Sequence, residues 1–401
     1  MTKKNHVRAS DLRGASRLAI DATLGLASLV ETMHHNILRT PGILGKSTQQ
    51  PAKGITGFVY KTIRGVARLV GGSIDAVLGQ LVPLLGRGTS SAEREAVLAA
   101  LNGVLGDHLA ASANPLAISM QLRRDGQPLE PTRKSLASTI PDATGKVLLL
   151  AHGLCMNDLQ WRRKGHDHGA ALAADAGFTP VYLHYNSGLH ISTNGRAFAE
   201  RIETLLGAWP VPIDELVILA HSMGGLVARS ACHCGKLARH AWLRHLRKVI
   251  FLGTPHHGAP LERGGNWVDA ILDASPYTTA FARLGKIRSA GITDLRHGSL
   301  VDADWEHRDR FARAQRKPRA LPLPNDVTCY AVAAAIAKKT SKLSEQILGD
   351  GLVPLDSALG RHADARRNLS IAKTRQWIGY GMNHLDLLDR RQVYARIRRW
   401  L

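Results

Sequence analysis

Apolar residues in the C-terminal two thirds of the chain fall into short runs separated by longer mixed stretches. Runs of this length without strict alternation are typical of strands that are buried on both faces. Between them, residues 192–207 and 223–238 have helical spacing. The apolar runs are 146–151, 179–185, 215–220, 248–253 and 327–334. This alternation of strand and helix predicts an α/β fold, in which helices cover both faces of a mainly parallel sheet.

Further signals lie around and within this region. Asp125-Gly126 follows a strand-like run, and this dipeptide favours a two-residue hairpin. A strand-like stretch at 369–378 precedes a final helix. Between 259 and 324 the strand–helix rhythm stops. Because connections between elements are usually short, we expect 259–324 to be a lid or cap inserted after the strand at 248–253.

The first 110 residues follow a different pattern. Apolar residues recur every three or four positions at 11–38 and 54–110, which predicts helices, and 41–54 is typical of a linker. We therefore expect a helical N-terminal region at 1–110 and an α/β domain at 111–401. Residues 54–86 combine an apolar stripe with basic residues. Two interpretations stay open for them: an interfacial helix on an anionic membrane, or a helix packed against the domain, which the glycines favour. The basic residues are Lys61, Arg64 and Arg68.

The charge balance is strongly basic, with 53 Lys and Arg against 32 Asp and Glu, a net charge of +21. Such an excess favours anionic partners, such as acidic lipid headgroups or nucleic acid. The basic residues are spread over several groups, which is typical of a solvated surface. Aromatic residues make up only 5% of the chain and no stacking motif is seen, so nucleic acid is not expected as a partner.

Cysteine usage and hydropathy bear on the compartment. The four cysteines do not suggest a disulfide framework, which fits a reducing environment. The sequence shows neither a clean secretory leader pattern nor an uncharged apolar stretch of about 18 residues. We therefore expect a cytoplasmic protein and leave peripheral contact with an anionic membrane open.

The strongest chemical signal is LVILAHSMGGLVARS at 216–230. An apolar strand runs into Ser222 and a helix follows, which is the G-x-S-x-G nucleophile elbow with Ala220 in place of the first glycine. Small residues are needed because neighbouring backbones approach closely, so a side chain larger than methyl would clash. The pattern predicts that Ser222 is a nucleophile.

A nucleophilic serine needs donors for the oxyanion. One expected donor is the N–H of Met223, which follows the serine, and the other is the N–H of Leu154, in the turn after the strand at 146–151. Two alternatives receive little weight. A metal site of His152, His166 and His168 lacks tight ligand spacing with carboxylates. Cys155 as a nucleophile lacks an elbow.

In folds with this nucleophile elbow, an acid and then a histidine follow the serine in the chain. Asp350 lies in a Gly-Asp-Gly turn and is preferred over Asp356. Asp326 precedes its strand and so lies at the wrong end of the sheet. Among 19 histidines, His384 is favoured because its loop lies between a strand-like stretch and the final helix. Asp386 is expected to be a first-turn acid of that helix.

Two other patterns carry no function. Gly45-Lys46-Ser47-Thr48 resembles the end of a phosphate-binding loop, but the required first glycine would fall at Thr40 and no strand precedes it. Cys232-His233-Cys234 suggests zinc, but these residues do not converge on a helix. No metal and no cofactor is therefore expected.

Several motifs together resemble the lipase and esterase branch of the α/β-hydrolases. They are LGTPHHGAPLER at 252–263, AHSMGG, His152-Gly153-Leu154, DGLVP and a late NHLDLL. They are similar to bacterial triacylglycerol lipases and to the lipase domain of GPI inositol-deacylase-like proteins, over roughly 145–260 and 325–401. Bacterial lipases of this group also carry the alanine form of the elbow. The resemblance implies an α/β-hydrolase fold and an architectural role for His256 and His257.

Motifs and resemblance together predict a serine hydrolase that cleaves a small-molecule or lipid ester through an acyl-enzyme. Ser222, His384 and Asp350 would form the triad. Thioester cleavage and acyl transfer use the same constellation and stay open. The alternative from another class is a non-catalytic, basic membrane- or nucleic-acid-binding protein on a hydrolase scaffold.

Overall fold

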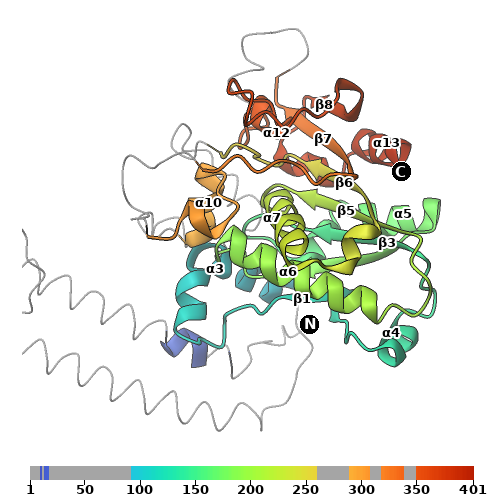
Figure 1. Cartoon of the computed structure of the whole chain (residues 1–401). Coiled ribbons are helices and arrows are strands. Elements are labelled where there is room, and N and C mark those ends of the chain that lie inside the picture. Colours follow the sequence, from blue (N-terminus) through green and yellow to red (C-terminus); the bar gives the residue numbers. More distant parts are fainter. Residues whose placement is uncertain (1–9, 11–12, 18–91, 260–288, 308–317, 338–348) are drawn as a thin grey trace, which may run out of the picture. The chain divides into compact units, whose positions relative to one another are not determined.

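The computed structural model describes residues 10, 13–17, 92–259, 289–307, 318–337 and 349–401 (Figure 1). The chain divides into two compact units, Met1–Arg94 with Leu109–Ala117, and Glu95–His108 with Ile118–Leu401. The domain boundary expected at residue 110 stays a prediction. The linker, the apolar stripe at 54–86 with its basic residues, and residues 260–288 and 308–317 of the expected lid lie outside the described residues, as does most of the helix expected at 11–38.

An eight-stranded sheet forms the centre of the second unit, in the order β2-β1-β4-β3-β5-β6-β7-β8. The strands from β3 onward pair in parallel, whereas β1 pairs antiparallel with β2 and β4. The strands are β1 Gln121–Arg124, β2 Gln127–Pro128, β3 Lys146–Ala151, β4 Thr179–His184, β5 Glu215–His221, β6 Leu246–Leu252, β7 Thr328–Ala335 and β8 Gln376–Tyr380. The predicted mainly parallel sheet is confirmed.

The Asp125-Gly126 hairpin is also confirmed. It joins β1 to β2, and both turn residues have positive φ (51° and 73°), as a type I′ turn requires.

Helices cover both faces of the sheet, which explains why its strands read as continuous apolar runs (Figure 1). Val147 and Leu149 of β3 belong to a core with α6 (Ile191–Gly207) and α7 (Met223–Ala238). The intervening residues Leu148 and Leu150 belong to a second core with α5 (His168–Ala176) and α13 (Arg391–Trp400). Successive strand residues point to opposite faces, so one apolar run serves two helix layers.

The remaining elements flank these layers. They are α3 Ala92–Ala111, α4 Arg133–Thr139, η1 Asp158–Trp161, η2 Ala241–Arg244, α10 Ala290–His297, η3 Asp302–Asp304, α12 Leu355–Ala358, η4 Lys373–Arg375 and η5 His384–Leu388. The strand expected at 369–378 begins only at Gln376, because Ile371 packs into a small core with Val353 and Leu355.

The position expected for Asp386 was wrong. It lies in the 3-10 turn η5, where its Oδ2 accepts a hydrogen bond from Asn383 N (3.1 Å), whereas the final helix α13 begins only at Arg391.

Part of the expected lid is described and is anchored on α6. Asp294 of α10 accepts hydrogen bonds through Oδ2 from His190 Nδ1 and Ile191 N, both at 2.9 Å. The His190 ring stacks on Trp305, with 3.7 Å between ring centroids. Residues 289–307 therefore contact the start of α6. A lid function for 259–324 stays a prediction.

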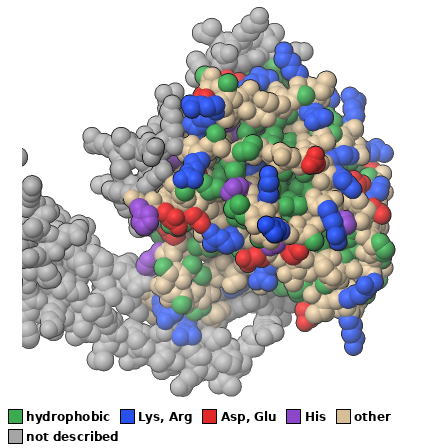
Figure 2. Space-filling model, in the orientation of Figure 1, with side chains coloured by type: hydrophobic (Ala, Val, Ile, Leu, Met, Phe, Trp, Pro, Cys, Tyr) green, Lys and Arg blue, Asp and Glu red, His purple; other side chains and the backbone are tan. Residues whose placement is uncertain are grey.

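Basic side chains are spread over the described part of the face that Figure 2 shows. On the face shown in Figure 2, Lys and Arg lie apart from one another with Asp and Glu between them. Within the described residues, no helix has the length and hydropathy needed to cross a membrane.

Candidate active site

Ser222 occupies a sharp turn between strand and helix. β5 ends at His221 and α7 begins at Met223, so one residue joins the two elements. Ser222 has φ 55° and ψ −125°, a combination that is sterically unfavourable for residues with a Cβ. Its N–H donates to Leu252 O (2.8 Å), which ties the turn to the end of β6. The geometry of the predicted elbow is confirmed.

Two glycines after Ser222 let neighbouring segments approach. A Cβ on Gly224 would lie 2.3 Å from Ala151 O, and one on Gly225 would lie 2.0 Å from Thr254 Oγ1. The sequence predicted a clash for side chains larger than methyl. The structure is stricter, because a methyl group itself is excluded at both positions.

The turn after β3 runs beside the serine. A Cβ on Gly153 would lie 3.0 Å from Ser222 Cβ, so the main chain around Gly153 borders the serine side chain. The first-turn N–H groups of a helix have no intrahelical acceptor, and α7 begins next to this turn. The assignment of the Leu154 and Met223 N–H groups as oxyanion donors therefore stays a prediction. The closeness of the Gly153 main chain to Ser222 and the N–H groups of the first turn of α7 support it.

Side chains hold the turn on both sides of Leu154. Tyr185 OH donates to His152 O (2.9 Å), and the two rings stack with centroids 4.3 Å apart. Cys155 N–H donates to Ser187 Oγ (3.1 Å). The residues after β4 thus fix the turn after β3.

α3 also packs against these loops. A Cβ on Gly103 would lie 2.2 Å from Cys155 Sγ, and one on Gly106 would lie 1.8 Å from Asn186 Oδ1. Asn186 Nδ2 in turn donates to Gly106 O (2.9 Å). Sequence reasoning missed this contact. The available signal was a pair of glycines in a helical stretch, where glycine weakens the helix and often marks close packing.

Asp350 and His384 form a buried pair. His384 Nδ1 lies 2.6 Å from Asp350 Oδ2, and the side chains are 6% and 0% exposed. Asp350 Oδ1 accepts hydrogen bonds from Leu352 N (3.0 Å) and Val353 N (2.8 Å). Because Nδ1 faces a carboxylate, it carries the ring proton and leaves the Nε2 lone pair free. A general base needs this state.

Tight turns bring this pair to the end of β6. Gly349 and Gly351 flank Asp350 with φ 49° and 92°, values that favour glycine. A Cβ on Gly253, which follows β6, would lie 2.9 Å from His384 Cε1. The imidazole therefore lies against Gly253. The residue before it, Leu252, accepts the hydrogen bond from Ser222 N–H through its carbonyl oxygen.

The structure disfavours the alternative residues, two by their position and Cys155 by its burial. The Asp356 side chain is 57% exposed and lies 3.7 Å from Arg361. Asp326 precedes β7, at the opposite end of the sheet. Cys155 is fully buried, and burial raises its pKa to about 12, which disfavours a thiolate. Among the described residues, no three His, Cys, Asp or Glu side chains are placed to hold a metal ion.

His256 and His257 lie in the turn after β6. His256 N–H donates to Ser357 O (3.2 Å) and His257 N–H to Ser357 Oγ (3.1 Å). Burial holds the pKa of His256 well below its ordinary value. These contacts support the architectural role expected for both residues.

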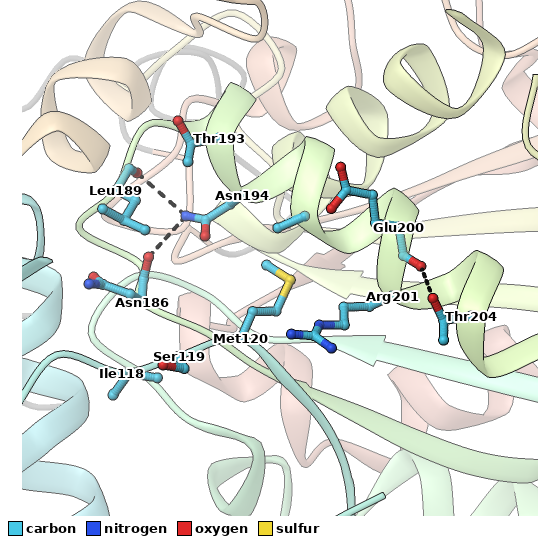
Figure 3. A pocket seen from close by; sticks show the side chains of 11 residues that line it. Ile118, Ser119, Met120, Asn186, Leu189, Thr193, Asn194, Glu200, Arg201 and Thr204 are labelled. Carbon is cyan, nitrogen blue, oxygen red and sulfur yellow. Dashed lines mark hydrogen bonds between the residues drawn. The ribbon is translucent and has the colours of Figure 1, made fainter. Parts of the chain in front are cut away.

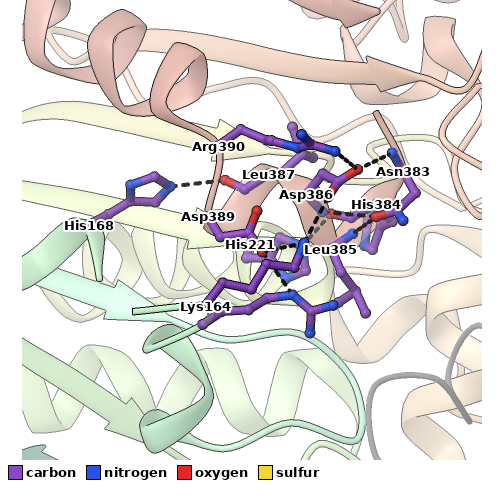
Figure 4. A network of polar contacts seen from close by, with 11 residues as sticks. Lys164, His168, His221, Asn383, His384, Leu385, Asp386, Leu387, Asp389 and Arg390 are labelled. Carbon is purple, nitrogen blue, oxygen red and sulfur yellow. Dashed lines mark hydrogen bonds and ion pairs between the residues drawn. The ribbon is translucent and has the colours of Figure 1, made fainter. Parts of the chain in front are cut away.

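Sequence reasoning also missed two histidines that contact the main chain around His384 (Figure 4). His221 contacts the carbonyl oxygen of His384, 163 positions along the chain. His168 contacts the carbonyl oxygen of Leu387, 219 positions along the chain. His221 belongs to the elbow motif and His168 to the disfavoured metal pattern, but neither pattern indicates a main-chain partner at such a separation.

A separate cavity of about 530 Å³ lies beside α6 (Figure 3). Asn194 Nδ2 donates to Asn186 O (2.9 Å), so the polar lining is partly paired within the chain. Its lining contains neither Ser222 nor Asp350 nor His384. The lining residues are Ile118, Ser119, Met120, Asn186, Leu189, Thr193, Asn194, Ala197, Glu200, Arg201 and Thr204.

The sheet order, the elbow after β5 and the chain order of Ser222, Asp350 and His384 are those of the α/β-hydrolase fold. Within this class, residues 142–322 match the family model described as "PGAP1-like alpha/beta domain". The matched segment includes Ser222 and the turn after β3, and it ends before Asp350 and His384. A search of curated proteins finds no match.

Solved structures with a related fold include lipases and an esterase. The mature Bacillus licheniformis lipase BlEst2 has a TM-score of 0.42 and 17% identity, over 70% of this chain and 97% of that chain. Aspergillus fumigatus lipase B has a TM-score of 0.39 and 10% identity, over 96% and 82%. A Thermogutta terrifontis esterase has a TM-score of 0.36 and 15% identity, over 64% and 90%. At these scores the likenesses carry no inference about substrate.

Proposed function

We propose that this protein is a serine hydrolase that cleaves carboxylic esters through an acyl-enzyme. The observation that carries the proposal is the buried His384–Asp350 pair, with 2.6 Å between Nδ1 and Oδ2, next to the strained turn at Ser222. Strain of this kind persists only where the surrounding structure supports it and is common at active sites.

The proposed reaction has two steps. His384 Nε2 takes the proton of Ser222 Oγ as the oxygen attacks the ester carbonyl, and Asp350 stabilises the resulting imidazolium. The N–H groups of Leu154 and Met223 would bind the oxyanion, at about 3–4 kcal/mol for each donor in the transition state. The alcohol leaves with the proton from His384. Water then attacks the acyl-enzyme by the same route and releases the acid. No step requires a metal or a cofactor.

The substrate class is proposed more broadly. The motif resemblance and the expected lid favour a small-molecule or lipid ester with an apolar acyl chain. A thioesterase or an acyltransferase would use the same groups. The non-catalytic alternative is disfavoured, because a binding protein has no need of a strained serine beside a buried Asp–His pair.

Labelling with a fluorophosphonate probe tests the proposal. The wild-type protein should be labelled at Ser222 and should hydrolyse p-nitrophenyl esters. Ser222→Ala should lose both while it stays folded, since loss of a triad nucleophile costs on the order of 10⁶ in turnover. Near-wild-type hydrolysis by Ser222→Ala would reject the site. An ester and thioester chain-length series, with and without added alcohol, then separates the three reactions.

A further inference from the structure

Two buried histidines hold the short turn that carries His384 (Figure 4). His221 Nε2 lies 3.3 Å from His384 O, and His168 Nε2 lies 2.9 Å from Leu387 O. His221 directly precedes Ser222, and His168 is the first residue of α5. The main chain of η5 is therefore held at its first and fourth residues by side chains from two other elements.

The chemistry of these contacts fixes the tautomers. A carbonyl oxygen only accepts, so both Nε2 atoms carry the ring proton. The Nδ1 lone pair of His168 then accepts a hydrogen bond from His166 Nε2–H (2.8 Å). Burial lowers the pKa of His168 to about 4 and that of His221 well below its ordinary value. At neutral pH both rings therefore stay uncharged and keep the donor proton on Nε2.

Gly253 leaves the turn little room to move. A Cβ there would lie 2.9 Å from His384 Cε1 and 2.8 Å from Leu387 Cδ1. The two side chains rest on the same glycine. Because packed interiors do not deform freely, a shift of the main chain at Leu387 also displaces the imidazole.

Ion pairs reinforce the far end of the turn. Arg163 Nε lies 3.1 Å from Asp389 Oδ2, and Lys164 Nζ lies 3.2 Å from the same atom. The Lys164 side chain is 61% exposed, and exposed pairs contribute only about 0–1 kcal/mol. The Arg163–Asp389 pair is less exposed, at 31% and 3%, so this pair and the two buried imidazole donors restrain the turn together.

We propose that His168 and His221 are positioning residues, which set the position and orientation of the His384 imidazole relative to Ser222. The inference rests on the proposed role of His384 as general base. Neither residue is assigned a contact with substrate, since their protonated nitrogens bind main-chain carbonyls. Displacement of a reacting group by about 1 Å can cost on the order of 10²-fold in rate.

Glutamine and asparagine variants test this role at each position. Glutamine can place its amide nitrogen near the position of imidazole Nε2, whereas asparagine is one methylene shorter and falls short of the carbonyl. We expect His168→Asn and His221→Asn to lower kcat by about 10- to 100-fold with little change in KM. His168→Gln and His221→Gln should keep most of the wild-type kcat. Glutamine and asparagine at His233, a partly buried residue of α7, provide the matched control and should both behave like wild type.

The kcat is expressed per site labelled to completion by the fluorophosphonate, so that loss of folded protein is not counted as loss of turnover. Equal kcat for the glutamine and asparagine variants at a position, whether normal or reduced, would overturn the positioning role there. If the wild-type protein is not labelled, or if Ser222→Ala still hydrolyses esters, the proposed function fails instead.

Discussion

Asp350→Asn should nearly abolish ester hydrolysis, for a reason that follows from the hydrogen bonds of Asp350. Its Oδ1 accepts from Leu352 N and Val353 N, so the asparagine oxygen must stay on that side. The asparagine NH₂ group then faces His384 Nδ1, which has to accept and moves the ring proton to Nε2. Such an imidazole cannot take the serine proton. The serine-protease precedent for this tautomer change is a loss of about 10⁴ in kcat, about 5 kcal/mol.

The assay is kcat for a p-nitrophenyl ester per folded protein, because an imidazole that cannot take the serine proton would also slow labelling by the fluorophosphonate. Asp356→Asn is the matched control, because this exposed carboxylate lies 3.7 Å from Arg361 and should be nearly neutral when changed. A loss below about tenfold for Asp350→Asn would refute the tautomer argument. The reverse ranking of the two variants would move the acid to Asp356.

Three further predictions concern packing, pH and membranes. Gly103→Ala should lower kcat, since its methyl group would lie 2.2 Å from Cys155 Sγ and overpacking costs about 1–3 kcal/mol. Because glycine also suits the φ of 58° at Cys155, Cys155→Gly should raise kcat and the urea midpoint more in the Gly103→Ala protein than in the wild type, and an equal effect in both would show that α3 does not act on the site through this contact. Stability should fall as pH drops from 6.5 to about 4, because the folded-state pKa of His168 lies below the unfolded value and the unfolded chain binds more protons in that window. Urea unfolding at pH 7 and pH 5 measures this, and a pH dependence that His168→Gln leaves unchanged would contradict the assignment. The full-length protein should sediment with anionic vesicles at low salt and be released as salt rises. If 54–86 makes the contact, reversing the charges of Lys61, Arg64 and Arg68 should abolish sedimentation. Unchanged sedimentation would exclude these three residues from the contact with the membrane.

Local patterns in the sequence predicted much of the fold. Parallel strands buried on both faces leave uninterrupted apolar runs, and a strand that ends in Ser222 with glycines after it marks the elbow. The Gly-Asp-Gly sequence likewise identified Asp350 as a candidate. Two glycines beside an acid indicate a tight turn, and both glycines do have the positive φ angles that such a turn needs. Features of this kind are readable because the residues that matter are neighbours in the chain.

What the sequence did not predict depends on contacts between distant segments. His168 and His221 contact the turn of His384 from 219 and 163 positions away. Their partners are main-chain carbonyl oxygens, which every residue has, so no residue type in the sequence marks them. The approach of Gly103 to Cys155 was also hidden, since a helical glycine alone does not name the segment that packs on it. Ile371 was expected in a strand because its apolar side chain fits either strand pairing or the small core that it occupies.

The backbone angles of Ser222 set thermostability and turnover against each other. Glycine adopts φ 55° with ψ −125° readily, whereas serine held there costs on the order of 1–3 kcal/mol. That cost is a large part of the roughly 5–15 kcal/mol by which a domain is stable. Selection of variants for heat resistance alone would therefore favour glycine at 222 and discard the hydroxyl group. A thermostable form of this protein that keeps the hydroxyl must gain its stability at other positions.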